Sequence, residues 1–418
     1  MPAGGRPQSP ISSLFVYGVI AYVINLTLAN RIRSVKPSAT LAVTNQANEL
    51  RAAGKDIIGL GAGEPDFDTP QHIKQAAIDA INAGKTKYTA VDGTPGLKQA
   101  VIEKFRRDNG LTYGADQILV SAGGKHTFYN LAQALLSAGD EVIIPAPYWV
   151  SYPDMVLLAG GVPVLIGAGI RSRFKIRAEQ LEAAITPRTK LFVLNSPSNP
   201  SGMSYTRDEL AQFGDVLRRQ PHVLIATDDI YEHIVWSPEG FNTLLNVCPD
   251  LIERSIVING VSNAYAMTGW RIGYCAGPAP LVKAMKVIQS QSTSNPSSIS
   301  QAAAQAALSG DQGCIAPMRA AFKRRHDQVV AALNAMPGVR CLAGDGTFYT
   351  FADFSDAISR LDGVADDVQL AAHLLDHAGV ALVPGSAFGV PGCGRISFAT
   401  SDAALDQAMD RMRRFFNA

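Results

Sequence analysis

Residues 255–274 read SIVINGVSNAYAMTGWRIGY, and this stretch decides how the chain is expected to fold. Its two ends, 255–258 and 271–274, are short runs of the kind that forms strands. The polar, glycine-containing loop between them carries Asn263 and Arg271. Ligands of open α/β sheets collect at the carboxyl ends of strands, so this loop is the first place to expect a functional site.

The same pattern extends upstream of this stretch. After residue 110, short apolar runs alternate with helical segments, which is typical of a mostly parallel sheet covered by helices on both faces. Helices are predicted at 125–137, 300–309 and 319–336, and a shorter α+β unit ends the chain. The sequence therefore predicts an α/β fold with one seven-stranded sheet and a smaller α+β part. The other five predicted strands are 118–120, 141–144, 162–166, 191–194 and 223–226.

The composition is that of a soluble globular enzyme. The chain has 418 residues, of which 47% are hydrophobic and 17% charged, enough for one large and one smaller domain. Thirty-seven basic against 36 acidic side chains exclude a broad attraction to nucleic acid. Five cysteines without a CxxC pair argue against disulfides or zinc and favour the cytoplasm. His373 and His377 are expected to meet on one helix face rather than to hold a metal.

The segment 121–125, SAGGK, follows a predicted strand and opens a predicted helix. Gly123 and Gly124 at a helix N-terminus would let backbone N–H groups approach an anion, and the helix dipole adds favourable charge. A plain strand-to-helix turn would have the same sequence. The segment is therefore a candidate phosphate site whose weight depends on the motifs around it.

Chemically distinctive residues follow the next predicted strands in turn. Trp149 follows the second strand and could stack on a flat ring. Asn199 lies in the segment NSPSNPSG after the fourth strand. Asp228 and Tyr231 follow the fifth, where a buried carboxylate and a phenol could meet a ligand, whereas Asp229 fits a helix-capping carboxylate better.

Together these segments resemble the class I pyridoxal-phosphate (PLP) aminotransferases of fold type I. Within that family they are most similar to the bacterial aspartate and aspartate/prephenate branch. The resemblance runs from about Arg31 to the end of the chain. The motifs stand in the family's order: 61–70 (GAGEPDFDTP), Tyr88, Gly123, Gly124, Lys125, Trp149, Asn199, Asp228, Tyr231, Arg271 and Arg395.

The resemblance implies which residues hold PLP. Arg271, eight residues after Asn263 (271 − 263), matches the arginine on the cofactor phosphate. Asn199 and Tyr231 match groups on the phenolic oxygen. Asp228 matches the partner of the pyridine nitrogen, which keeps the ring an electron sink. The implied cofactor set is Gly123, Gly124, Lys125, Trp149, Asn199, Asp228, Tyr231, Gly260, Arg271 and Tyr88, the last reaching across a homodimer with shared active sites.

The resemblance also implies a dicarboxylic amino-acid substrate. Arg395 matches the arginine that forks onto the α-carboxylate, a task suited to a planar bidentate donor. Lys36 and Lys125 resemble residues that meet the distal carboxylate. This implies aspartate, glutamate and their 2-oxo acids, with prephenate as a further candidate. The implied substrate set is Gly63, Lys36, Lys125, Trp149, Asn199 and Arg395.

Asn263 stands where the family has lysine. The lysine amine forms a Schiff base with PLP and then moves the Cα proton, whereas an asparagine amide is neither nucleophilic nor basic near neutral pH. An introduced change, a natural loss and a sequence error all account for it, because lysine and asparagine codons differ by one base. We therefore expect an aspartate:2-oxoglutarate transaminase scaffold that is slow or inactive. Gly260, where many relatives have a phosphate-binding serine, should weaken the cofactor only modestly.

Two other functions stay open. The chain could be a non-catalytic protein that binds PLP or an amino acid. It could also be a membrane-anchored assembly protein, an interpretation that rests only on the uncharged residues 8–30 and their apolar run 14–24. A membrane anchor, an arm on a partner subunit and an extension outside the mature enzyme all explain this run. We favour the last, because the resemblance begins near Arg31.

The resemblance and the change of pattern near residue 300 give a division of the chain. We expect an apolar N-terminal extension at 1–30 and, at 31–60, an N-terminal arm that also forms part of a small domain. A large PLP-binding domain at 61–300 and a small domain with its linking helix at 301–418 complete the division.

Overall fold

Residues 27–417 are described by a computed structural model, and a seven-stranded sheet lies at the centre of their larger part. Its strand order is β2-β8-β7-β6-β5-β3-β4. β8 runs antiparallel to both neighbours, and the other neighbouring pairs are parallel. The predicted seven-stranded, mostly parallel sheet is therefore confirmed. The bounds are β2 (Ile118–Ser121), β3 (Glu141–Ala146), β4 (Val162–Gly167), β5 (Thr189–Asn195), β6 (Leu224–Asp228), β7 (Ser255–Gly260) and β8 (Gly273–Ala276).

Helices cover both faces of this sheet because its strands are apolar on both sides. Alternate residues of one strand enter different cores: Leu119 packs with one set of helices, and Val120 packs with the other. The helices beside Leu119 are α5 (Gly124–Leu135), α6 (Ser151–Leu158) and α10 (Ala279–Ser290). Those on the opposite face are α3 (Gln71–Asn82), α4 (Pro95–Lys104), α7 (Ala178–Ala184), α8 (Arg207–Arg218), α9 (Leu244–Val247) and α11 (Ser298–Ser309).

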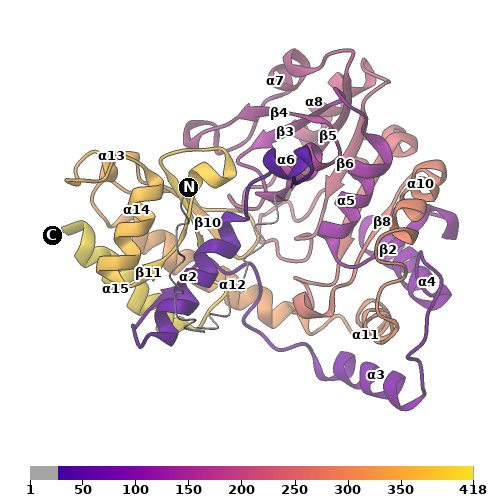
Figure 1. Ribbon diagram of the computed structural model, residues 1–418, viewed down its shortest axis with the longest axis horizontal. Helices are drawn as coiled ribbons and strands as arrows, with labels where there is room; N and C mark the ends of the chain where they lie inside the picture. Colours follow the sequence, from indigo (N-terminus) through magenta and orange to yellow (C-terminus); the bar gives the residue numbers. More distant parts are fainter. Residues whose placement is uncertain (1–26, 418) are drawn as a thin grey trace, which may run out of the picture.

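A second, four-stranded sheet lies in the C-terminal part, at the left of Figure 1. Its order is β12-β13-β10-β9, all antiparallel. His373 and His377 lie beside it with ring centroids 5.4 Å apart, as their spacing predicts. The strands are β9 (Arg340–Cys341), β10 (Tyr349–Asp353), β12 (Val383–Pro384) and β13 (Cys393–Ser397), and the helices are α12 (Ile315–Asn334), α13 (Ser355–Ile358), α14 (Asp367–His373) and α15 (Asp402–Asn417).

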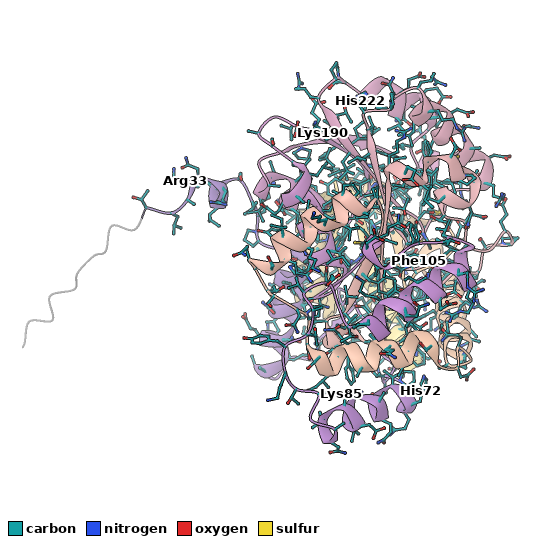
Figure 2. The ribbon with its side chains drawn as sticks, turned by 90° about the vertical axis from the view of Figure 1, so that its right-hand side faces the viewer. Arg33, His72, Lys85, Phe105, Lys190 and His222 are labelled. Atoms are coloured by element: carbon teal, nitrogen blue, oxygen red, sulfur yellow. The ribbon has the colours of Figure 1, made fainter. Side chains whose placement is uncertain are left out.

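The start of the described chain joins the C-terminal part. α2 (Ala39–Ala52) contacts β1 (Ile58–Gly59) and β11 (Val380–Ala381), which pair in parallel. The short helix α1 (Asn30–Arg33) stands at the margin of the molecule, where Figure 2 shows Arg33 away from the main body. Within residues 27–417, no helix is both long and apolar enough to cross a membrane. The apolar run 14–24 lies outside the described residues.

An unusually close backbone contact joins β8 to the start of α5. A Cβ atom added to Gly273 would lie 2.3 Å from the N of Gly124 and 2.4 Å from the C of Gly123. Glycine at 273 therefore lets the edge strand β2 and its following turn press directly on β8. The same contact brings the loop before β8 against the N-terminus of α5.

Gly273→Ala should destabilise the protein by about 1–3 kcal/mol, because the methyl group can fit only by displacing backbone. The measurement is the urea midpoint of the full-length chain. Gly167→Ala is the matched control, since a Cβ there meets no atom within 4 Å, and it should change stability by no more than about 0.5 kcal/mol. Equal midpoints for the two variants would contradict the close contact.

Candidate active site

A cavity of about 440 Å³ opens at the carboxyl ends of the central strands. This volume lies within the range of small-molecule sites. Its walls come from the large sheet, from α2 and from β10 and β13 of the second sheet. Predicted site residues that line it are Gly63, Gly124, Lys125, Trp149, Asn199, Asp228, Tyr231, Asn263, Arg271 and Arg395.

One end of the cavity is suited to a phosphate, and we call this end, formed by the first N–H groups of α5 and by Arg271, the anion seat. α5 begins at Gly124, so its first backbone N–H groups have no partner within the helix. Arg271 stands beside them, with Nη1 donating to the Thr268 carbonyl at 2.8 Å. Gly123 has φ +95°, and a Cβ there would lie 2.4 Å from Arg271 Nη2. Glycine is therefore needed here both for the backbone angle and for the guanidinium.

Lys125 adds a second positive group near this end. Its Nζ lies over the Trp149 ring, 5.1 Å from the centroid. Burial lowers the pKa of Lys125, and the positive charge of Arg271 lowers it further. A dianionic group bound here would relieve that repulsion.

The middle of the cavity holds a partly buried carboxylate. Asp228 ends β6, and burial raises its pKa to about 6. The Tyr152 hydroxyl donates to Asp228 Oδ2, and the Ile230 N–H donates to Oδ1 at 3.3 Å. Asn195 Nδ2 holds the Asp228 carbonyl at 2.8 Å. A basic ring nitrogen could share a proton with this carboxylate.

The far end holds a buried guanidinium. Arg395 is 1% exposed, and burial lowers its pKa. Its Nη1 donates to Asn199 Oδ1 at 3.0 Å, and its Nη2 donates to the Gly61 carbonyl at 2.8 Å. Its Nε has no hydrogen-bond partner among the described residues. The guanidinium also lies 4.3 Å from the Tyr349 ring centroid. Because burying an unpaired positive charge is costly, an anionic ligand would stabilise Arg395 here.

Asn263 lies on the wall between these groups. It is 6% exposed and follows β7 by three residues (263 − 260). No hydrogen bond links its side-chain amide to another described residue. Its backbone carbonyl accepts one hydrogen bond, from the Ala266 N–H at 3.5 Å. The amide is therefore directed by packing and is open to a ligand.

Some predicted site residues do not line the cavity. Lys36 is exposed, and Tyr88 is 91% exposed. Gly123 lies behind Arg271, and Gly260 is buried against Ile230 and Gly273. The ligand contacts of these four stay predictions.

The interpretation of Asp229 as a helix-capping residue is wrong. No helix begins after it, and its side chain is 3% exposed. Burial raises its pKa well above the usual range, and the charge of Glu232 raises it further.

Part of the cavity wall consists of residues that no sequence motif indicated. Asn195 opens the segment NSPSNPSG that also holds Asn199, and Tyr152 lies three residues after Trp149 on the helix that follows. The α2 residues carry no chemical signature, because only the fold brings this helix to the large sheet. The missed residues include Ser38, Thr40, Leu41, Thr44, Tyr152, Asn195, Thr268 and Tyr349.

A buried ion pair supports the strand ends from behind. Lys104, 0% exposed, pairs with Glu232, which follows Tyr231. Asn109 donates to Glu232 Oε2 at 2.8 Å, and Asn259, next to Gly260, donates to Oε1 at 2.9 Å. Burial opposes the charge of Glu232, but Lys104, with a smaller contribution from Asn109, lowers its pKa overall. The ends of β6 and β7 are thus tied to one carboxylate.

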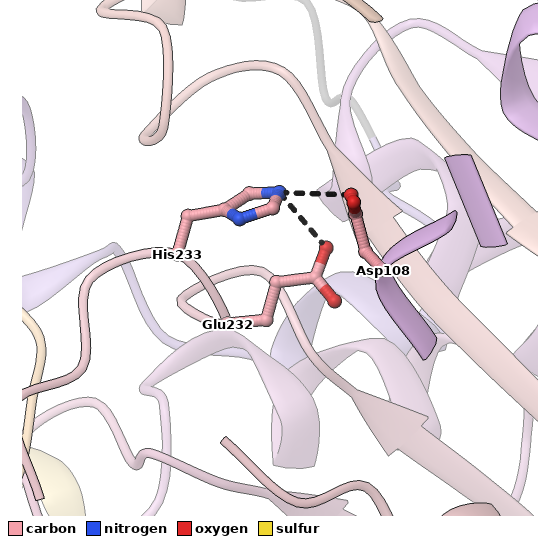
Figure 3. Close-up of side chains that lie close together, drawn as sticks. All are labelled: Asp108, Glu232 and His233. Carbon is pink, nitrogen blue, oxygen red and sulfur yellow. Dashed lines mark ion pairs between the residues drawn. The ribbon is translucent and has the colours of Figure 1, made fainter. Parts of the chain in front are cut away.

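Figure 3 shows His233 beside this carboxylate. His233 Nε2 is 3.4 Å from Glu232 Oε1 and 3.5 Å from Asp108 Oδ2, a grouping of metal-ligand types that sequence spacing did not indicate. The ammonium of Lys104 already neutralises Glu232, and a metal ion there would meet a like charge. The cluster is therefore an internal ion pair with a neighbouring histidine, whose pKa burial lowers.

Comparison with known proteins decides the family. Residues 55–412 match the family model described as aminotransferase class I and II. The chain belongs to that family. An aspartate/prephenate aminotransferase of Nitrosomonas europaea is 58% identical over 392 residues, which are 93% of this chain and 99% of that protein. An aspartate aminotransferase of Rhizobium meliloti is 51% identical, over 92% and 95% of the two chains.

Solved structures agree with this aminotransferase assignment. The crystal structure of the aspartate aminotransferase from Rhizobium meliloti has a TM-score of 0.90 and 50% identity, over 94% of this chain and 99% of that one. The Thermus thermophilus aspartate aminotransferase with maleate has a TM-score of 0.88 and 42% identity, over 93% and 99%. The aminotransferase therefore has the fold type I architecture, and its family uses PLP. The anion seat at α5, the partly buried Asp228 and the Arg395 Nε, which has no partner among residues 27–417, fit a phosphorylated pyridine and a carboxylate.

Lys104→Met should cost the aminotransferase about 3–5 kcal/mol, because it leaves Glu232 charged and buried without its partner. Chemical denaturation of the full chain measures this. The double variant Lys104→Met, Glu232→Gln should recover much of the loss. Lys323→Met, which breaks the exposed pair with Asp327, is the control and should stay within about 0.5 kcal/mol. If Lys104→Met were as stable as Lys323→Met, then the carboxylate of Glu232 would be accessible to water and not buried.

Proposed function

We propose that this chain has the binding site of an aspartate:2-oxoglutarate aminotransferase and that Asn263 leaves its turnover slow or absent. One observation carries the proposal. A single cavity gathers an anion seat, the partly buried carboxylate of Asp228 and the buried guanidinium of Arg395, and Asn263 also lines it. The likeness to aspartate and aspartate/prephenate aminotransferases supports the same reaction class.

Different residues of the cavity would bind different parts of the cofactor. When bound, PLP supplies an electron-withdrawing ring that stabilises negative charge at the substrate Cα. Arg271 and the first N–H groups of α5 would hold its phosphate, and Trp149 would cover one ring face. Asp228, ionised above its pKa of about 6, would pair with the ring nitrogen. The Tyr231 hydroxyl and Asn199 Nδ2, which lie 3.4 Å from each other, would donate to the phenolic oxygen.

The substrate would lie between Arg395 and α2. The Arg395 guanidinium would bind the α-carboxylate, and the hydroxyls of Thr40 and Thr44, together with Lys125, would face the rest of the substrate. Maleate, present in the related Thermus structure, is a dicarboxylate, which supports a dicarboxylic substrate here. Aspartate, glutamate and their 2-oxo acids fit this description, and prephenate is a further candidate.

Asn263 would limit the chemistry most, and it would leave PLP held by noncovalent contacts alone. Its amide can neither attack an aldehyde nor accept the Cα proton near neutral pH. Loss of a general base alone costs about a hundredfold to ten-thousandfold in rate. Lys125 is a poor substitute for the missing base, because its ammonium lies over Trp149 beside the anion seat. We infer that the protein keeps its ligands but turns them over poorly.

A homodimer would complete this site. Ile78 and Ile81 lie on α3 and are 46% and 51% exposed, and the exposed Tyr88 follows this helix. Figure 2 shows this region at its lower edge, where His72 of α3 and Lys85, just after the helix, are labelled. Apolar residues gathered on one exposed element suit a partner surface. The domain division at residues 31–60, 61–300 and 301–418 and a cytoplasmic location belong to the same proposal.

A non-catalytic homologue that binds PLP or an amino acid is the second candidate. The specific observation in its favour is Asn263 itself, since the binding groups around it are complete without a lysine. This candidate differs from a disabled enzyme in one respect. It need not regain activity when lysine is restored.

Asn263→Lys should raise the rate of aspartate:2-oxoglutarate transamination at least about a hundredfold over the native chain. Oxaloacetate formation in a coupled assay measures it, with Asn263→Gln as the control that changes the side chain without adding an amine. Recovery supports a disabled aminotransferase. Binding of PLP without recovery would favour the non-catalytic candidate, and equal rates for native and lysine forms would overturn our account of Asn263.

Arg395→Lys, made in the Asn263→Lys protein, should raise the KM for aspartate more than tenfold, because lysine cannot donate two parallel hydrogen bonds. Steady-state kinetics with aspartate measures this. Arg340→Lys is the control, since Arg340 pairs with Asp353 and is 60% exposed at its side chain. An unchanged KM in Arg395→Lys would remove Arg395 from the substrate site.

A further inference from the structure

Tyr152 lies directly behind the carboxylate of the site. It is 2% exposed, and its hydroxyl donates a hydrogen bond to Asp228 Oδ2. Burial raises the pKa of Tyr152 well above its usual range, and the nearby charge of Asp228 raises it further. The phenol therefore keeps its proton and acts as the donor.

Aromatic packing fixes the direction of this hydroxyl. The Tyr152 ring lies 4.8 Å from the Phe128 ring of α5 and 5.2 Å edge-on from the Trp149 ring. Its backbone N–H also donates to the Trp149 carbonyl at 3.1 Å. The turn that presents the indole to the cavity thus also sets the position of the tyrosine.

The other groups around Asp228 do not duplicate this bond. Asn195 on β5 donates to the backbone carbonyl of Asp228 and not to its carboxylate, and Ile230 supplies a backbone N–H. Asp229 and Tyr231, which follow β6, carry the other titratable groups nearby. On β7, the residue paired with Asp228 is the apolar Ile258. Among residues 27–417, the Tyr152 hydroxyl is the one side-chain donor to this carboxylate.

We propose that Tyr152 is a positioning residue that keeps Asp228 ionised and oriented for the ring nitrogen of PLP. The inference rests on the proposed function, since it assigns Asp228 that partner. A hydrogen-bond donor to the charged form of a carboxylate favours its ionisation. The bond from Tyr152 also holds Oδ2 in place, which fixes the orientation of the whole carboxylate in the cavity. Tyr152 itself would touch neither the reacting atoms nor the phosphate.

The proposal has a defined pH signature. Asp228 binds the protonated ring nitrogen only when ionised, so its contribution to PLP affinity is present above its pKa and lost as the pH falls through it. Burial has already raised that pKa to about 6. Tyr152→Phe removes the donor, raises the pKa of Asp228 further, and moves the loss of affinity to higher pH.

The test is the PLP dissociation constant of the full chain, followed by absorbance and tryptophan fluorescence from about pH 5 to about pH 8.5, which spans the usual range of raised carboxylates. We expect the midpoint of Tyr152→Phe to lie about one pH unit above that of the native protein. Affinity at the highest pH should change less than about threefold, because the Tyr152 bond matters little once both proteins hold Asp228 ionised. Binding of inorganic phosphate, which reports only the α5 end, should not change.

Tyr205→Phe is the matched control. Tyr205 is also buried, at 7% exposed, but its hydroxyl accepts from the Ile176 N–H at 3.1 Å, away from Asp228. Asp228→Asn is the second variant: it should flatten the pH dependence, and adding Tyr152→Phe to it should have no further effect.

The outcomes separate the two levels of inference. A native chain that binds no PLP at any pH would overturn the proposed function and this inference with it. Native binding whose pH midpoint is unchanged in Tyr152→Phe would overturn only the role of Tyr152. An equal shift in Tyr205→Phe, or a persistent effect in the Asp228→Asn background, would also overturn it.

Discussion

The site depends on one backbone contact, the approach of Gly273 to Gly123 and Gly124. β8 enters the sheet antiparallel between β2 and β7, so the loop before it turns toward the start of α5. This contact brings Arg271 against a helix N-terminus that lies far away in the sequence. A bulkier residue at 123 or 273 would separate the guanidinium from the N–H groups, and the anion seat would be lost before any ligand contact changed.

Under the proposed function, the residues that bind the ligands are different from the residue that would carry the chemistry. Arg395, Asp228 and the α5 terminus hold their positions through contacts with the protein and not through residue 263. The strand ends have a second support in Lys104 and Glu232, which lie behind the cavity. An asparagine at 263 therefore leaves the architecture of an aminotransferase intact, and under the proposed function its main effect would fall on reactivity.

Much of the fold could be predicted from the sequence, because buried parallel strands are continuous apolar runs, and all seven were found within a few residues. Residues after those runs, such as Asp228 and Asn199, reach the cavity because strand ends meet at one edge of the sheet. Tyr152 and the hydroxyls of α2 could not be predicted in this way. Their roles arise from packing between distant segments, for which single-sequence periodicity carries no signal. Asp229 was misassigned because a turn, not a helix, follows β6.

The parallel pair β1 and β11 has a consequence for how the chain is made. It joins Ile58 to Val380, 322 positions apart (380 − 58). A ribosome releases the chain from its N-terminus, so residue 58 must wait for nearly the whole polypeptide before it can pair. The α2 wall of the cavity is attached to that strand, and the pocket is therefore among the last parts to be completed during synthesis, long after the central strands have emerged.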